Sequence, residues 1–295
     1  MWNDRRVEDR QLTQELAWRG RTVRWDRIGS GPALVFLHGT PWSSLLWRPI
    51  ALPMAGRFTV YLWDMPGYGT SSKDPSHAVD LGTQGELFAA LLEHWGLDRP
   101  HVIAHDFGGA VALRARLLHG ARFASLCLVD VVALAPWGSP FFKLVQEHAR
   151  VFEQLPSAVH RGAVEAYISG ASHKGLRVDE LRMLVDPWSD EEGQPAFYRQ
   201  IAQADERFTT EIETQLGRLT EPVHIVWGAE DTWIPADRAR RLNDAIPHAS
   251  VTLIPEAGHL IQLDAPAALS AELTNWMATT DARTEKREAA VPIAE

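Results

Sequence analysis

Asp106 is the residue whose sequence surroundings most clearly suggest chemistry. It lies in HVIAHDFGGA (residues 101–110), where a short apolar run ends and a helical pattern begins at once. A strand that turns sharply into a helix exposes one side chain above the sheet, and this arrangement is a nucleophile elbow. Ala104 and Gly108 are the small residues that such a turn needs on either side. The segment predicts that Asp106 is a nucleophile, although an Asp that only caps the helix is the plainer alternative.

A carboxylate at this position would attack a different bond from an alkoxide. The following helix N-terminus favours an anion, so Asp106 is expected to be ionised at neutral pH. Attack on an ester carbonyl would give an anhydride, which is a poor route. Attack on a saturated carbon that carries a leaving group gives a stable alkyl ester on the enzyme. The residue type therefore favours substitution at saturated carbon.

Two further groups follow Asp106 in the chain order nucleophile, acid, histidine. Asp231 comes just after the apolar run at residues 223–227, and His259 follows Gly258 just after the run at 250–254. Open α/β sheets keep their sites at the carboxyl ends of the strands, where both residues are expected to lie. Asp130 is a rival for the acid role, but the longer polar loop that carries Asp231 favours the latter.

The segment His38-Gly-Thr-Pro41 ends another apolar run. The backbone N–H groups of Thr40 and Phe107 are expected to form an oxyanion hole beside the nucleophile. A plain Gly-Pro turn is the alternative interpretation of the same residues.

The elements that must position these residues alternate between strands and helices. An antiparallel hairpin is expected over residues 17–27, and helices over 80–95 and 107–119. Strands are expected over six short apolar runs: 33–37, 58–63, 101–104, 125–132, 223–227 and 250–254. Strands separated by crossover helices predict an α/β fold with a mostly parallel, doubly wound sheet.

About 90 residues separate the strand ending near 132 from the one starting at 223, which is too long for a simple connection. Residues 135–215 are therefore predicted to form a helical cap inserted into a core made of residues 1–134 and 216–279. Residues 280–295 are expected to be a flexible tail.

Composition excludes several classes of partner. The formal net charge is −9, which argues against nucleic-acid or anionic-membrane partners. No apolar run approaches membrane-spanning length, and residues 1–10 lack a secretory signal pattern. The single cysteine, Cys127, cannot form an internal disulfide, which fits a cytoplasmic protein. No cofactor or metal is implied, and a homodimer is a possibility.

The motifs together resemble the Asp-nucleophile branch of the α/β-hydrolase fold superfamily, which contains epoxide hydrolases and haloalkane and haloacid dehalogenases. The resemblance extends from about residue 16 to 277 and rests on five segments: HGTP (38–41), DMPGYG (64–69), AHDFGG (104–109), Asp231 and Gly258-His259. It implies Asp106, His259 and Asp231 as the catalytic residues, with a small apolar organic substrate.

The two reactions of this branch differ in how the leaving group is held. Epoxide hydrolases are known for cap tyrosines that donate to the leaving oxygen, and the segment Phe197-Tyr198-Arg199 resembles their motif. Tyr167 is the nearest candidate for a second donor. Haloalkane dehalogenases place a Trp after the nucleophile, where this chain has Phe107, which offers no side-chain N–H. The resemblance therefore favours an epoxide hydrolase.

Several features keep other interpretations open. The segment LHGTPWSSLLWR (37–48) is similar to a haloalkane dehalogenase segment, and cap tryptophans could hold a halide. A small-molecule receptor with a hydrolase fold is a third class, disfavoured by the complete catalytic set. Ser43 and Ser44 give no reason to expect a serine esterase. The residues expected to line the substrate pocket are His38, Pro41, His105, Trp137 and Trp188.

Overall fold

The computed structural model describes residues 12–289 of the chain. One eight-stranded sheet forms its centre, in the order β1-β2-β4-β3-β5-β6-β7-β8. β1 pairs antiparallel with β2, and β2 with β4; every later pair is parallel. The strands are β1 (Gln14–Trp18), β2 (Arg21–Gly29), β3 (Ala33–Leu37), β4 (Thr59–Trp63), β5 (His101–His105), β6 (Ser125–Val129), β7 (Val223–Gly228) and β8 (Ser250–Ile254). The predicted mostly parallel, doubly wound sheet is confirmed.

The helices divide between the sheet and an insertion after β6. Those of the core are α2 (Arg48–Met54), α3 (Leu81–His94), α4 (Phe107–Leu118), α10 (Asp237–Ala245), α11 (Ile261–Asp264) and α12 (Pro266–Ala289). Those of the insertion are α5 (Pro140–Phe152), α6 (Ser157–Ser169), α7 (Val178–Val185), α8 (Gly193–Ala202) and α9 (Arg207–Glu213). Short 3₁₀ turns occupy Ser44–Leu46, Asp186–Trp188 and Leu216–Arg218.

The central strands are apolar on both faces because helices cover both faces. In β3, Val35 and Leu37 belong to the cluster that packs under α3 and α4, whereas Leu34 and Phe36 belong to the cluster under α2 and α12. Successive side chains of a strand point to opposite faces, so a continuous apolar run is what a doubly covered strand requires.

Local sequence signals explain several helix boundaries. α3 begins after Asp80, whose side chain accepts a hydrogen bond from the Thr83 N–H at 3.0 Å. α5 begins after Ser139, which accepts from the Phe142 N–H, with Pro140 in its first turn. Both caps satisfy backbone donors that a helix start leaves without partners.

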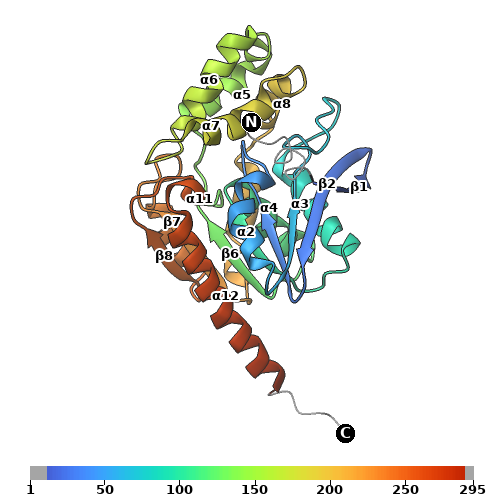
Figure 1. Cartoon of the computed structure of the whole chain (residues 1–295), viewed down its shortest axis with the longest axis vertical. Coiled ribbons are helices and arrows are strands. Elements are labelled where there is room, and N and C mark those ends of the chain that lie inside the picture. The colour runs from blue at the N-terminus through green and yellow to red at the C-terminus, as the bar shows by residue number, and fades with distance from the viewer. Residues whose placement is uncertain (1–11, 290–295) are drawn as a thin grey trace, which may run out of the picture.

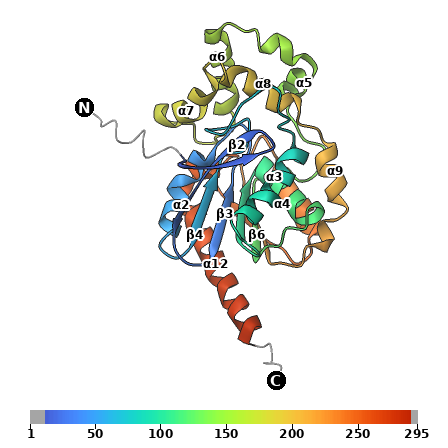
Figure 2. The ribbon, with the colours of Figure 1, turned by 90° about the vertical axis from the view of Figure 1, so that its right-hand side faces the viewer.

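Figures 1 and 2 show α5, α6, α7 and α8 gathered over one end of the sheet, while α12 extends away from them. These helices occupy the stretch predicted to be a cap. α12 runs to Ala289, past the start of the predicted tail. The flexibility of that tail stays a prediction, and its residues 290–295 lie outside the described residues. Residues 1–10, which were expected to carry no secretory signal, lie outside them as well. Within the described residues, no helix has both the length and the apolar character to cross a membrane.

Candidate active site

Asp106 occupies the turn between β5 and α4 with a backbone conformation that side chains rarely adopt. Its φ and ψ are 51° and −123°, and it is almost fully buried. The turn is possible because glycines lie where the neighbouring backbone comes very close, so that no Cβ atom is in the way. A Cβ atom built on Gly39 would lie 2.3 Å from the Asp106 Oδ1 atom, and one on Gly108 would lie 2.5 Å from the His38 carbonyl oxygen. A strained conformation held by close packing is typical of a functional residue.

Each carboxylate oxygen of Asp106 has its own neighbour. Oδ1 accepts a hydrogen bond of 2.6 Å from the backbone N–H of Thr40. Oδ2 lies 3.4 Å from Nε2 of His259. Thr40 is thus next to the Asp106 carboxylate, where an oxyanion-hole donor is expected, and Phe107 follows Asp106 at the start of α4. The turn after β3 and the turn after β5 therefore meet at one carboxylate.

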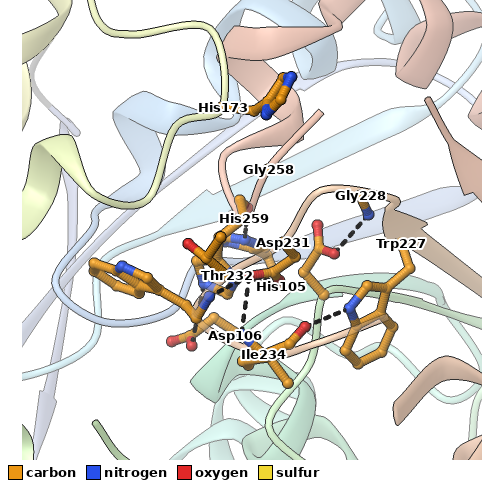
Figure 3. A network of polar contacts seen from close by, with 12 residues as sticks. His105, Asp106, His173, Trp227, Gly228, Asp231, Thr232, Ile234, Gly258 and His259 are labelled. Atoms are coloured by element: carbon orange, nitrogen blue, oxygen red, sulfur yellow. Dashed lines mark hydrogen bonds and ion pairs between the residues drawn. The ribbon is translucent and has the colours of Figure 1, made fainter. Parts of the chain in front are cut away.

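His259 is fully buried between two acidic residues (Figure 3). Its Nδ1 lies 2.9 Å from Oδ2 of Asp231, whose other oxygen accepts the backbone N–H groups of Trp233 and Ile234. Burial lowers the pKa of His259, but the charges of Asp231 and Asp106 outweigh burial and raise the pKa well above its ordinary value. The free site therefore favours a protonated imidazole between two carboxylates.

Asp130 stands beside this set without contacting the imidazole. Its Oδ1 accepts the backbone N–H of Gly228 at 2.8 Å, and its Oδ2 is buried without a hydrogen-bond partner. Burial, with the nearby charge of Asp231, raises the pKa of Asp130 well above its ordinary value. Asp231 is therefore the carboxylate that orients His259, in agreement with the preference from the sequence.

A cavity of about 340 Å³ opens above Asp106. Its walls are mainly apolar and come from the loops after β6 and β7 and from the cap. Tyr167 and Trp137 both line it, as does Trp233. An enclosed apolar space with a few polar groups is the usual form of a small-molecule site.

Tyr198, predicted to donate to a leaving group, does not line this cavity. Its side chain is fully buried inside the cap, where its hydroxyl is 2.8 Å from Nδ1 of His160 and its ring packs against Phe152. The prediction for Tyr198 is therefore wrong, because the residue stabilises the cap. Tyr167 stacks on Trp233 with ring centroids 4.5 Å apart and does line the cavity.

Four residues expected in the pocket are not among those that line it. The imidazole of His38 lies between the Gly39 carbonyl oxygen and the Met65 N–H, so it ties two turns together. His105 sits beside His259, with its Nε2 3.0 Å from the His259 carbonyl oxygen (Figure 3). Both imidazoles are buried and hold backbone segments together. Burial, together with the charge of the neighbouring His259, lowers the pKa of His105 to about 3.

The other two are Pro41 and Trp188, which contact each other. The indole N–H of Trp188 donates to the Pro41 carbonyl oxygen at 2.9 Å and so joins the cap to the core. Trp137 does line the cavity as predicted, but its indole N–H donates to the Thr209 hydroxyl at 2.8 Å. Both indole N–H groups therefore have protein acceptors.

Gln200 is a cap residue near the site that the sequence interpretation missed. Its side-chain oxygen accepts from the Thr40 hydroxyl at 2.6 Å and from the Tyr68 hydroxyl at 3.0 Å. The sequence contains a signal for this residue. Gln200 is a polar residue on the side of α8 that Phe197, three positions before it, and Ile201, one position after it, mark as buried. Gln200 connects the cap to the residue whose N–H holds Asp106.

Trp233 was missed as well, although it lies only two residues after Asp231. Its ring stacks on His259 at a centroid distance of 5.2 Å and on Tyr167 of the cap at 4.5 Å. The indole therefore bridges His259 and the cap.

The comparisons with known proteins agree with this architecture. Residues 32–266 match the α/β hydrolase fold family. The chain belongs to that family. A solved α/β hydrolase fold protein from Burkholderia ambifaria is 43% identical, with a TM-score of 0.87 over 90% of this chain and 97% of that chain.

More distant relatives carry different activities in their names. Haloalkane dehalogenase 2 from Mycobacterium bovis is 26% identical over 86% of this chain and 91% of its own length. A thermophilic esterase from Thermogutta terrifontis is 21% identical, with a TM-score of 0.74 over 91% of this chain and 99% of that chain. Family membership therefore establishes the fold, and the reaction must be argued from the site.

Proposed function

We propose that this protein is a hydrolase that forms a covalent alkyl ester on Asp106. The observation that carries the proposal is the position of the Asp106 carboxylate, with Oδ1 on the Thr40 N–H and Oδ2 3.4 Å from His259. A carboxylate at this apex gives a stable ester only when it attacks a saturated carbon.

The first step is a substitution at carbon. Oδ2 of Asp106 attacks, a carbon–oxygen bond forms, and the bond between that carbon and the leaving group breaks with its electron pair on the leaving group. Oδ1 becomes the ester carbonyl oxygen and stays on the Thr40 N–H. The geometry thus prepares the carbonyl for the second step.

The second step is hydrolysis of the ester by water. Alkylation removes the negative charge of Asp106, one of the groups that raise the pKa of His259. The imidazole can then release its proton to solvent, or to the alkoxide of an opened epoxide, and act as base toward a water molecule, while Asp231 holds its orientation. Attack of water on Cγ of Asp106 puts negative charge on Oδ1, which the N–H groups of Thr40 and Phe107 stabilise. Collapse then breaks the bond between Cγ and the alkyl oxygen, and the imidazolium gives that oxygen a proton, so the alcohol leaves. The water oxygen stays on Asp106, whose carboxyl proton passes back to His259.

An epoxide is the substrate class that we favour. Ring opening gives an alkoxide, which a phenol in reach stabilises by donating a proton or hydrogen bond. Tyr167 is the one phenol among the residues that line the cavity. Burial, and to a lesser extent the charge of Asp106, raises the pKa of Tyr167 well above its ordinary value, so the hydroxyl keeps its proton at neutral pH.

Haloalkane or haloacid dehalogenation is the second candidate, supported by the dehalogenase among the relatives. A halide needs N–H donors rather than a proton. Phe107 has no side-chain donor, and the indoles of Trp137 and Trp188 donate to protein oxygens. These contacts favour the epoxide over the halide.

The test uses trapped intermediates. His259→Ala should react with styrene oxide or 1-bromohexane but release product slowly, so mass spectrometry should find an ester on Asp106. An epoxide adduct with a diol product from the wild type supports the full proposal, while a hexyl adduct with bromide release alone selects the dehalogenase. Asp106→Ala is the control and should form no adduct; turnover of that variant at the wild-type rate would refute the proposal.

A further inference from the structure

Arg238 of α10 lines the active-site cavity, and Arg241 of the same helix contacts the same backbone segment beside it. Arg238 lines the cavity, and its guanidinium donates to the carbonyl oxygens of Ala135 at 3.2 Å and Pro136 at 2.9 Å. Arg241 is exposed and donates to the same Ala135 oxygen at 3.3 Å. Two guanidinium groups therefore converge on one carbonyl oxygen beside the cavity.

No carboxylate among the described residues lies within 4.0 Å of either of these guanidinium groups. Several other arginines pair with carboxylates, as Arg116 does with Glu221 and Arg161 with Asp186. Like charges held close together repel each other, and this chain has 38 acidic residues that could have offset them. Among the described residues, Arg238 and Arg241 have hydrogen-bond partners that are neutral carbonyl groups. Because these partners carry no negative charge, the positive charge of the two arginines is available to an anion.

The rest of the cavity is suited to an alkyl chain. Arg238 is the only cationic side chain among the residues that line it, and Asp106 is the only anionic one. The walls between them include Leu134, Trp137 and Phe142. The volume of about 340 Å³ corresponds to roughly ten water-sized groups of about 30 Å³ each. An anionic substrate would be repelled by Asp106 unless a cation such as Arg238 received its charge.

We propose that the cavity takes a small organic anion, in which a carboxylate pairs with Arg238 and an alkyl chain brings the reactive carbon to Asp106. Arginine suits this role because its planar guanidinium can bind a carboxylate through two parallel hydrogen bonds. The inference rests on the proposed function for its reacting carbon, but the anion site itself requires no reaction. Arg241, exposed beside Arg238, adds positive charge that attracts the anion.

Binding of unreactive alkanoates tests the anion site directly. Isothermal titration of the wild type with hexanoate, acetate, inorganic phosphate and 1-hexanol should show hexanoate as the tightest of the anions. Arg238→Met should weaken hexanoate binding at least about tenfold, the size expected for a charge-assisted hydrogen bond. Its affinity for 1-hexanol should change less than about twofold, which also shows that the cavity is intact. Arg240→Met is the matched control, because Arg240 is an exposed arginine of the same helix that does not line the cavity.

Three outcomes would overturn the anion site. These are no saturable hexanoate binding by the wild type, equal hexanoate affinity in the wild type and Arg238→Met, and acetate or phosphate binding as tightly as hexanoate, which would place the anion outside the cavity.

A second arm compares 5,6-epoxyhexanoate with 1,2-epoxyhexane, and 6-bromohexanoate with 1-bromohexane. Arg238→Met should raise KM for the carboxylate member of a reactive pair at least about tenfold and leave the uncharged member nearly unchanged. Hexanoate binding that depends on Arg238, without any ester on Asp106, would keep the anion site and refute the proposed function. Turnover through Asp106 in which Arg238→Met leaves KM for the carboxylate substrates unchanged would keep the proposed function and refute the anion site.

Discussion

Asp264 is predicted to hold the cap against the loop that carries His259. It lies in α11, nearly buried, and its carboxylate accepts four hydrogen bonds. Three come from the cap: the Ser172 hydroxyl at 2.5 Å, the His173 N–H at 2.8 Å and the Lys174 N–H at 3.3 Å. The fourth comes from the Gly258 N–H at 2.8 Å, directly before His259 in the chain.

Asp264→Asn keeps the size of the side chain but turns one acceptor oxygen into a donor. If the NH2 group takes the place of Oδ2, this donor faces the donor N–H groups of His173 and Gly258. If it takes the place of Oδ1, it faces the donors of Ser172 and Lys174. Either orientation loses two hydrogen bonds to a charged group, at about 1.5–3 kcal/mol each. The expected loss of stability is about 3 kcal/mol or more, and at about 2 °C per kcal/mol for a large domain the melting temperature should fall by about 6 °C.

The assay is thermal unfolding followed by circular dichroism, with limited proteolysis of the cap loop between α6 and α7 as a second measurement. Asp179→Asn is the control, because the Asp179 side chain is 78% exposed and its ion pair with Arg177 is 3.4 Å long. Exposed pairs of this kind contribute less than about 1 kcal/mol. If Asp264→Asn melts within about 1 °C of the wild type, or no lower than the control, the role assigned to these four bonds is wrong.

Three further predictions concern the site itself. Gly39→Ala should abolish ester formation without unfolding the protein, since its Cβ would lie 2.3 Å from the nucleophile; normal burst kinetics would contradict this. Tyr167→Phe should slow epoxide opening by about 10²-fold or more, the usual size of an acid–base contribution, whereas Tyr198→Phe, which loses a bond inside the cap, should lower stability by about 1 kcal/mol and leave the opening rate nearly unchanged. The third follows from the raised pKa of His259: stability should fall as pH rises from about 6.5 through that pKa, because the folded state keeps a proton that the unfolded state has lost. Asp231→Asn should flatten that fall in a pH series of melting temperatures, and an unchanged profile would exclude His259 as its source.

The closeness of Asp106, Asp231 and His259 could be predicted from the sequence because the signals that mark them are local. Asp106 is marked by the strand before it and the small residues around it, and His259 by the strand and Gly258 before it. The carboxyl ends of parallel strands lie at one edge of a sheet, so naming the strands already placed these groups near one another. The choice between Asp130 and Asp231 was less secure, since both follow such strands, and only the path of the loop shows which carboxylate reaches the imidazole.

The fold, the elbow and the chain order of Asp106, Asp231 and His259 follow from the sequence alone, whereas only the tertiary packing shows which residues of the cap face the core beside Asp106. Tyr198 and Gln200 show the reason. They are two positions apart on α8, and at about 100° per residue their side chains leave the helix on nearly opposite sides. Tyr198 faces His160 within the cap, and Gln200 faces Thr40 of the core. Which side of a helix faces the site depends on how the whole helix docks, and that depends on packing between segments far apart in the chain.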